Sequence, residues 1–181
     1  FDLVRFCTGL EFERVGCLAA TIFPDRPGGR VDNDDTAAVS AELTGGIQAQ
    51  FSLSRVHSFG PQVMELEIQG TNGALRLQPS LSVNPHNYLL EYTKRNGTYA
   101  PVAIPEYHFH GSDVPFDWDM HFGEFLFTEL AYRLIRSIET DSPPSPSLED
   151  GMKAQAVIDA ADRSAAERGG IVKIPSLSQS F

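Results

Sequence analysis

Apolar and polar residues alternate through the first two thirds of the chain in short runs that turn residues separate. Residues 11–23 predict a strand, and residues 24–33 predict a polar loop rich in proline and glycine. Strict alternation over residues 35–43 and 47–55 predicts two half-buried strands. Two consecutive glycines stand between these strands, which indicates a β-hairpin.

Further strands follow in the same part of the chain. They are predicted over residues 63–69, 75–77, 88–92 and 98–104. Asn72-Gly73 and Asn96-Gly97 stand in the intervening turns, where residues that tolerate positive φ favour a tight hairpin. The pattern therefore predicts an antiparallel meander.

In the last third of the chain the apolar spacing changes to 3.6 residues, which predicts two amphipathic helices. The first begins near Asp119 and is broken by the proline-rich residues 141–146. Its apolar stripe consists of Phe127, Leu130, Ala131, Leu134, Ile135 and Ile138.

The second of these helices has clear signals at both ends. Ser147 is placed to cap it, with Asp150 as an approximate capping box. Gly169-Gly170 ends it, and residues 171–174 predict a closing strand. Its apolar stripe consists of Ala154, Val157, Ile158, Ala161 and Ala165.

The chain opens inside a helical pattern, over residues 1–8, which Gly9 ends. The pattern predicts one apolar side made of Leu3, Val4, Phe6 and Cys7. The order is then one helix, a block of strands, two helices and an edge strand, which predicts an α+β fold. We expect a single domain, residues 1–181, with an open, mostly antiparallel (mixed) β-sheet. We expect helices to pack on one face of this sheet and the other face to be available for subunit contact.

Composition narrows the classes of partner. The 181 residues carry a formal net charge of −10, which disfavours nucleic acid and anionic membrane surfaces as partners. No apolar run approaches the length that a bilayer requires. Two cysteines, Cys7 and Cys17, are too few for a disulfide scaffold. We interpret both as small buried residues. The absence of a disulfide framework is compatible with a reducing cytoplasm.

Several segments together resemble one family. They are residues 1–9, the stretch from Asp34 to Arg55, residues 67–75, Glu149-Asp150-Gly151 and Ser164-Ala165. In this order they resemble the C-terminal domain of the Gfo/Idh/MocA oxidoreductases. Asp2 matches the last residue of that family's His-x-x-Asp segment.

The resemblance implies a two-domain enzyme that moves a hydride between NAD or NADP and a sugar, inositol or related polyol. The cofactor would be bound by an N-terminal Rossmann domain that is absent from this chain. The chain has no Gly-x-Gly-x-x-Gly motif of its own. The proton-transfer histidine would fall upstream of Phe1, so we expect no catalytic residue here and no activity from the chain alone.

The resemblance also implies a homodimer or homotetramer formed through the open sheet face. A stand-alone binding or oligomerisation domain without catalysis is the alternative. The two differ in what precedes Phe1, since only the enzyme requires a nucleotide-binding unit there.

Four residues are predicted to face substrate. Arg55 and His57 follow the second hairpin strand, where they could bond hydroxyls or a carboxylate, or simply be solvated. Trp118 could stack on a sugar ring, as could Tyr107, although a buried anchor is the simpler interpretation of Trp118. His121 opens the first long helix.

Two clusters of titratable residues leave alternatives open. His108, His110, Asp117, Asp119 and His121 lie within fourteen residues. Their spacing is compatible with a metal site, a substrate-pocket loop or a plain surface loop, and we assign no metal ligand. Asp34 and Asp35 could form a paired acid site, but a turn and strand start is the more common role of such a pair.

Overall fold

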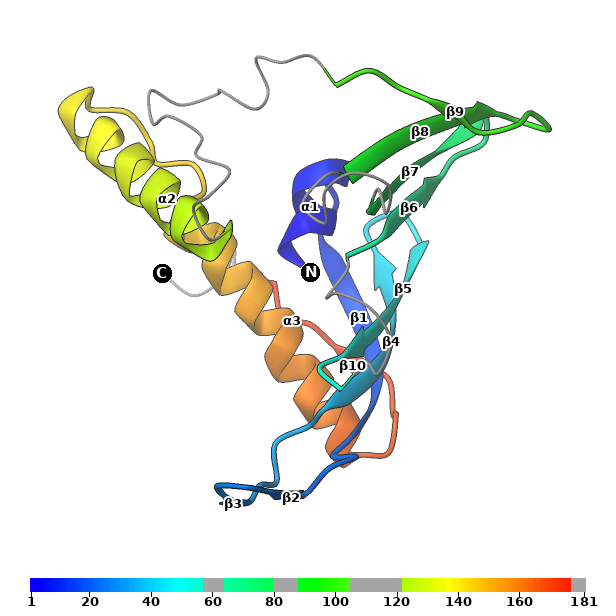
Figure 1. The fold of residues 1–181 in the computed structure, drawn as a ribbon, viewed down its shortest axis with the longest axis vertical. Helices are drawn as coiled ribbons and strands as arrows, with labels where there is room; N and C mark the ends of the chain where they lie inside the picture. Colours follow the sequence, from blue (N-terminus) through cyan, green and yellow to red (C-terminus); the bar gives the residue numbers. More distant parts are fainter. Residues whose placement is uncertain (57–63, 80–87, 105–121, 177–181) are drawn as a thin grey trace. The chain divides into compact units, whose positions relative to one another are not determined.

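A computed structural model describes residues 1–56, 64–79, 88–104 and 122–176 of the chain (Figure 1). The chain divides into two compact units. Unit 1 comprises Phe1–His57 and Ser137–Phe181, and unit 2 comprises Ser58–Arg136. The helices are α1 (Asp2–Thr8), α2 (Phe122–Glu139) and α3 (Leu148–Ala166). The strands are β1 (Phe12–Ala20), β2 (Asp25–Arg26), β3 (Gly29–Arg30), β4 (Thr36–Leu43), β5 (Ile47–Ser54), β6 (Leu66–Gln69), β7 (Gly73–Pro79), β8 (Tyr88–Lys94), β9 (Ala100–Pro101) and β10 (Val172–Lys173).

The predicted α+β class is confirmed, and every strand pair among the described residues is antiparallel. The sequence predicts one open sheet. The described strands instead form two four-stranded sheets, β10-β1-β4-β5 and β6-β7-β8-β9, and the short pair β2-β3. Alternation specifies strands and their faces but not which strands pair, so the sequence pattern contained no sign of this division.

The sheet of unit 1 contains the predicted hairpin. β4 and β5 pair along their whole length, with Leu43 opposite Ile47. β1 lies on the other side of β4, with Cys17 opposite Val39. The closing strand predicted over residues 171–174 is present as β10, which pairs with the start of β1.

The core of unit 1 lies between α3 and one face of this sheet. Because side chains alternate along β1 and β4, Val15, Val39 and Leu43 point to the face that α3 covers. Burying each such side chain contributes roughly 1.5–3 kcal/mol. The buried apolar residues are Phe12, Val15, Cys17, Val39, Ala41, Leu43, Val157, Ala160, Ala161 and Ile174. The prediction that helices cover one face thus holds for α3.

The start of α3 has the predicted cap. The Ser147 hydroxyl accepts a hydrogen bond from the Asp150 amide at 3.2 Å, and the Asp150 carboxylate accepts one from the Ser147 amide at 2.9 Å. Together these form a full capping box. An N-cap of this kind stabilises a helix by about 1 kcal/mol.

The end of α3 is joined to β1 by a buried serine. Ser164 has no exposed surface. Its hydroxyl accepts a hydrogen bond from the Cys17 amide at 2.7 Å and donates one to the Gly170 carbonyl at 2.6 Å. Both backbone groups are therefore satisfied where β10 no longer pairs with β1.

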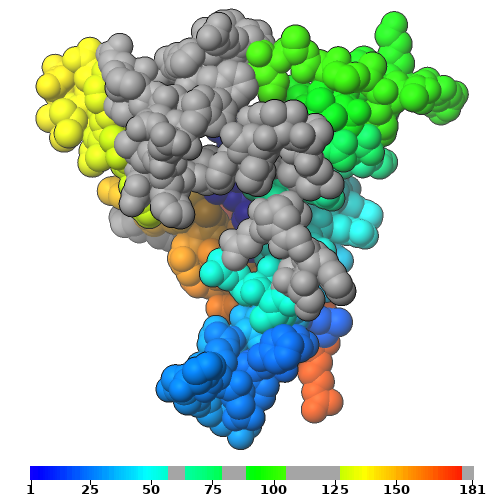
Figure 2. Space-filling model, viewed as in Figure 1, coloured from blue at the N-terminus to red at the C-terminus, as the bar shows by residue number. Residues whose placement is uncertain are grey.

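The loop predicted over residues 24–33 contains a short β-ladder. β2 and β3 pair antiparallel, and their side chains are exposed. In the space-filling view this segment forms part of the blue surface of unit 1 (Figure 2). Buried Asp35 holds the base of the ladder, because its carboxylate accepts hydrogen bonds from the Phe23 amide, at 2.8 Å, and from Arg26.

The inward side of α1 agrees with the prediction at Val4, which packs against the core, but differs from it at Phe6 and Cys7. Phe6 is 85% exposed and Cys7 is exposed, whereas Arg5 is buried. The prediction that both cysteines are buried is therefore right for Cys17 and wrong for Cys7. The predicted inward side of α1 rested on apolar spacing alone. Arg5 is buried instead because it pairs with the carboxylates of Glu11 and Asp150, which lie outside this helix.

Unit 2 contains the sheet β6-β7-β8-β9, in which the two faces differ in polarity. Leu66, Leu77 and Leu90 are cross-strand neighbours on one face, and Glu67, Arg76 and Glu91 on the other. The predicted first long helix is present as α2, which crosses the boundary between the units. No helix among the described residues is both long and apolar enough to cross a membrane.

Candidate functional site

Of the four residues predicted to face substrate, the structure describes Arg55. It follows β5 directly, its side chain is exposed, and its amide donates a hydrogen bond to the Asp35 carbonyl at 2.8 Å. This bond ties the end of β5 to the residue before β4. His57, Trp118 and His121 lie outside the described residues, so the substrate-facing role of the four residues remains a prediction.

The histidine- and aspartate-rich cluster, to which no metal was assigned, also lies outside the described residues. This applies to all its members, His108, His110, Asp117, Asp119 and His121, and to Tyr107. Within the described part of the chain, no three His, Cys, Asp or Glu side chains gather closely enough to hold a metal ion.

Of the two acids that precede β4, Asp35 has a structural role. This side chain is only 3% exposed. The hydrogen bond from the Phe23 amide is the main reason that the pKa of its carboxyl lies below the usual value, and Arg26 lowers this pKa further. A carboxylate held ionised by such partners anchors a loop, which agrees with the interpretation as a turn and strand start.

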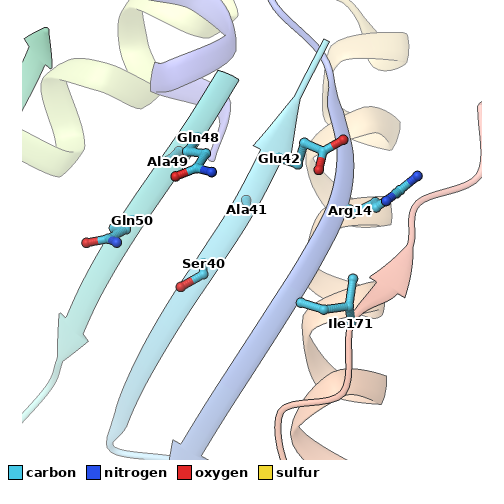
Figure 3. A pocket seen from close by; sticks show the side chains of 8 residues that line it. All are labelled: Arg14, Ser40, Ala41, Glu42, Gln48, Ala49, Gln50 and Ile171. Carbon is cyan, nitrogen blue, oxygen red and sulfur yellow. The ribbon is translucent and has the colours of Figure 1, made fainter. Parts of the chain in front are cut away.

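The side of the unit 1 sheet that α3 does not cover forms a second candidate surface, which we call the open face. It includes Arg14 and Gly16 of β1, Ser40 and Glu42 of β4, and Gln48 and Gln50 of β5. A depression of about 340 Å³ lies on it, with Ile171 at its rim (Figure 3).

Strand register arranges the open face in rows. Arg14, Glu42 and Gln48 are successive cross-strand neighbours, and Gly16, Ser40 and Gln50 form the next row. The Ile171 side chain lies against Gly16, where an added Cβ would be 2.8 Å from its terminal carbon. A larger residue at this position would require the end of the Ile171 side chain to shift. The face offers charges, amides and apolar groups for contact, but no buried acid, base or nucleophile.

A third candidate is a charged cluster at α1, which we call the Arg5 cluster. Arg5 is 8% exposed, and its guanidinium contacts Asp2, Glu11 and Asp150. Nε and Nη2 donate to the two carboxylate oxygens of Glu11 at 2.8 and 3.1 Å. This fork-shaped pairing is the geometry in which an arginine–carboxylate interaction is strongest.

The remaining contacts of the Arg5 cluster extend to α3. Nη1 donates to the Asp150 carbonyl at 3.3 Å, and Nη2 donates to its carboxylate at 3.2 Å. Lys153 adds a second positive charge, with Nζ 3.1 Å from Glu11 and 2.9 Å from Glu149. The cluster therefore joins α1, the residue before β1 and the first turn of α3.

Two acids of the Arg5 cluster, Glu11 and Asp150, have lowered pKa values. The hydrogen bond from Arg5 is the main cause that lowers the pKa of Glu11. The pKa of Asp150 falls to about 2, chiefly because the Ser147 amide donates to its carboxylate, with Ser147 hydroxyl and Arg5 hydrogen bonds adding to the effect. Sequence reasoning missed this cluster. The spacing of Asp2 and Arg5 was the local signal, but only the fold adds Asp150.

Unit 2 has its own polar cluster. Arg76 donates to one carboxylate oxygen of Glu91 through Nε at 3.0 Å and Nη2 at 2.7 Å, and Gln78 donates to the same oxygen. The guanidinium also stacks over the Tyr99 ring, 4.2 Å from its centroid. These side chains contact one another, which indicates a structural role.

The described residues do not form a dinucleotide site. Such a site needs parallel strands joined by a helix whose N-terminus meets the pyrophosphate. All described strand pairs are antiparallel, and no helix joins two neighbouring strands in that way. No step of hydride chemistry is therefore assigned to these residues.

Comparisons with known proteins agree on one family. Residues 1–174 match the model of the oxidoreductase family C-terminal alpha/beta domain, GFO_IDH_MocA_C. The chain is also similar to an inositol 2-dehydrogenase of Rhizobium meliloti (strain 1021), with 29% identity over 168 residues. The match covers 93% of this chain and 45% of that protein.

Solved structures show the same fold. An oxidoreductase domain protein from Kribbella flavida superposes with a TM-score of 0.76 at 24% identity, over 97% of this chain and 48% of that one. A levoglucosan dehydrogenase in complex with NADH and levoglucosan superposes with a TM-score of 0.76 at 23% identity, with the same coverage of both chains. The chain thus spans about half the length of the relatives it matches.

The fold and the sequence match point to the same assignment. The match extends over nearly all elements, from α1 to β10, and so includes both units. The chain belongs to the Gfo/Idh/MocA oxidoreductase family, and residues 1–174 correspond to the C-terminal alpha/beta domain of that family.

Proposed function

We propose that this chain is the substrate-side and assembly domain of an NAD(P)-dependent oxidoreductase that acts on a sugar, inositol or related polyol. The similarity to an inositol 2-dehydrogenase along 93% of the chain is the observation that carries this proposal. Structural neighbours that were solved with NADH and levoglucosan, or with NADH and L-sorbose, support it.

The proposal assigns cofactor binding to one domain and substrate contact to another. NAD or NADP is bound by a Rossmann domain outside these residues, and the cofactor supplies the hydride chemistry. The catalytic residues lie there or ahead of Phe1, so the 181-residue chain alone is inactive. Arg55, His57, Trp118 and His121 face the substrate. The exposed guanidinium of Arg55 offers several N–H donors to hydroxyl oxygens.

A turnover assay tests this proposal. The full-length protein that carries this chain is mixed with NAD or NADP and with inositol, levoglucosan or sorbose, and formation of the reduced cofactor is followed. We expect turnover with at least one of these substrates and none from the 181-residue chain alone. Absence of turnover with every polyol and both cofactors would contradict the proposal.

Variants then separate substrate contact from general surface charge. Arg55→Ala is expected to raise KM about tenfold with a smaller change in kcat. The substitution removes a contact with the substrate and no group that takes part in hydride transfer. Arg30→Ala removes another exposed arginine, on β3, and should leave KM unchanged. Equal effects of the two substitutions would count against a substrate-facing Arg55.

We also infer that the open face is where a second copy of the chain docks, to give a dimer or tetramer. Leu18 and Ile171 are 61% and 67% exposed on this face and add apolar surface to it. A two-fold axis places a patch against itself. A patch that carries both Arg14 and Glu42 can therefore offer each charge an opposite one.

The assembly proposal is tested by solution mass. Ser40 lies in the centre of the open face, so Ser40→Arg should convert the oligomer to a single chain by placing a bulky charge in the interface. Gln155→Arg adds the same charge at an exposed position of α3 and should leave the mass unchanged. Light scattering after gel filtration measures both. A monomeric unmodified protein would contradict the inference, whereas an oligomer without polyol turnover would favour a non-catalytic assembly domain.

A further inference from the structure

Arg5 is a buried charged group with several ionic contacts, although it lies on α1, a short helix with little stability of its own. An isolated helix of seven residues is marginal in water, so α1 depends on its tertiary contacts. Two kinds of contact are present. One is apolar and lies at Phe1, and the other is ionic and lies one turn later at Arg5.

The apolar contact holds the first residue of the chain. The Phe1 ring meets Phe12 edge to face, with centroids 5.5 Å apart, and meets Phe51 at 4.9 Å. Aromatic pairs of this geometry fix relative orientation as well as burying surface. They anchor the start of α1 to the core face of the sheet.

The ionic contact fixes the rotation of α1 about this anchor. The Arg5 guanidinium donates to Glu11 through Nε and Nη2, to Asp150 through Nη2 and to Asp2 through Nη1. Glu11 and Asp150 lie outside α1, whereas Asp2 belongs to it. A planar fork held by two carboxylates from outside α1 leaves the helix little freedom to turn or slide. Its contact with Asp2, at 3.0 Å, also directs that carboxylate.

We propose that Arg5 is a positioning residue, which sets the placement of α1 and of Asp2 for the reaction. This inference rests on the proposed function, because Asp2 matches the functional segment of the family only through the resemblance. Asp2 is half exposed and free to face solvent or substrate on its other side. Arg5 itself is buried and has no surface for substrate, so it acts through α1.

The test compares variants of the full-length protein. Arg5→Gln should lower kcat by about tenfold or more, while KM for the polyol and the Kd for NADH stay within about twofold. Arg5→Lys should recover part of kcat, since an ammonium can serve some of the carboxylates without the fork. Arg76→Gln is the matched control, because it breaks a similar arginine–glutamate pair in unit 2. It should leave kcat within about twofold despite a comparable fall in Tm.

Equal losses of kcat in Arg5→Gln and Arg76→Gln, or an unchanged kcat in Arg5→Gln, would overturn the proposal. If the unmodified protein shows no turnover, the proposed function fails. Hydrogen exchange then tests separately whether Arg5 holds α1 in place. The Gly9 amide, bonded to the Arg5 carbonyl at 2.8 Å, should then exchange about tenfold faster in Arg5→Gln, with β4 and β5 amides unchanged. Unchanged exchange at Gly9 would overturn the positioning role itself.

Discussion

Replacing Leu43 with alanine is expected to lower the free energy of unfolding by about 2–5 kcal/mol. Leu43 is 1% exposed at the end of β4, opposite Phe12 of β1, and belongs to the core beneath α3. Truncation removes buried methyl groups and leaves a cavity that close-packed neighbours fill only in part. Urea denaturation followed by far-UV circular dichroism measures the loss.

The same hairpin supplies the control for this prediction. Ile47 is the cross-strand partner of Leu43 but is 52% exposed. Ile47→Ala should therefore cost less than about 1 kcal/mol, because most of its surface is in water in either state. Similar losses from the two substitutions would show that the core does not lie where the structure places it.

Gly73→Ala is expected to destabilise the sheet of unit 2 by about 1–3 kcal/mol, or to break the end of its β7–β8 pairing. A Cβ on Gly73 would overlap the Thr93 carbonyl oxygen and would lie 3.1 Å from Cε2 of Tyr92. A backbone oxygen cannot rotate away as a side chain can, so the two strands must shift. The fall in the urea midpoint measures the cost.

Gly70 begins the same turn and provides the matched variant. An added Cβ there would lie 3.6 Å from the Gly73 carbonyl oxygen, an ordinary contact. Gly70→Ala should accordingly change stability by less than about 1 kcal/mol. Hydrogen exchange at the Arg95 amide, which bonds the Asn72 carbonyl at 2.9 Å, reports on the turn directly. Slow exchange of this amide in Gly73→Ala, with an unchanged midpoint, would contradict the predicted clash.

The elements that the sequence predicted well are those with a strong local signal. Alternation placed β4 and β5 within one residue of their observed bounds, because a period of two is a property of the strand itself. Ser147 and Asp150 marked the start of α3 for a similar reason, since a capping box involves only neighbouring residues.

The structure tests less of the predicted site than of the predicted fold. Arg55 lies at the end of β5 as the hairpin pattern indicated, and Asp35 serves the turn before β4. Which side chains then share a pocket depends on contacts between distant segments, which periodicity does not encode. The substrate-facing role of Arg55, His57, Trp118 and His121 therefore stays a prediction, which the Arg55→Ala variant tests at Arg55.

By itself the sequence determined the α+β class, most strands, the two long helices and the resemblance to the family that the comparisons confirmed. The tertiary structure alone decided the division into two sheets and the inward side of α1. Apolar spacing favoured Phe6 for that side, yet Arg5 is buried because Glu11 and Asp150 converge on it. A charge is buried only where partners meet it, and partners distant in sequence are brought together only by the fold.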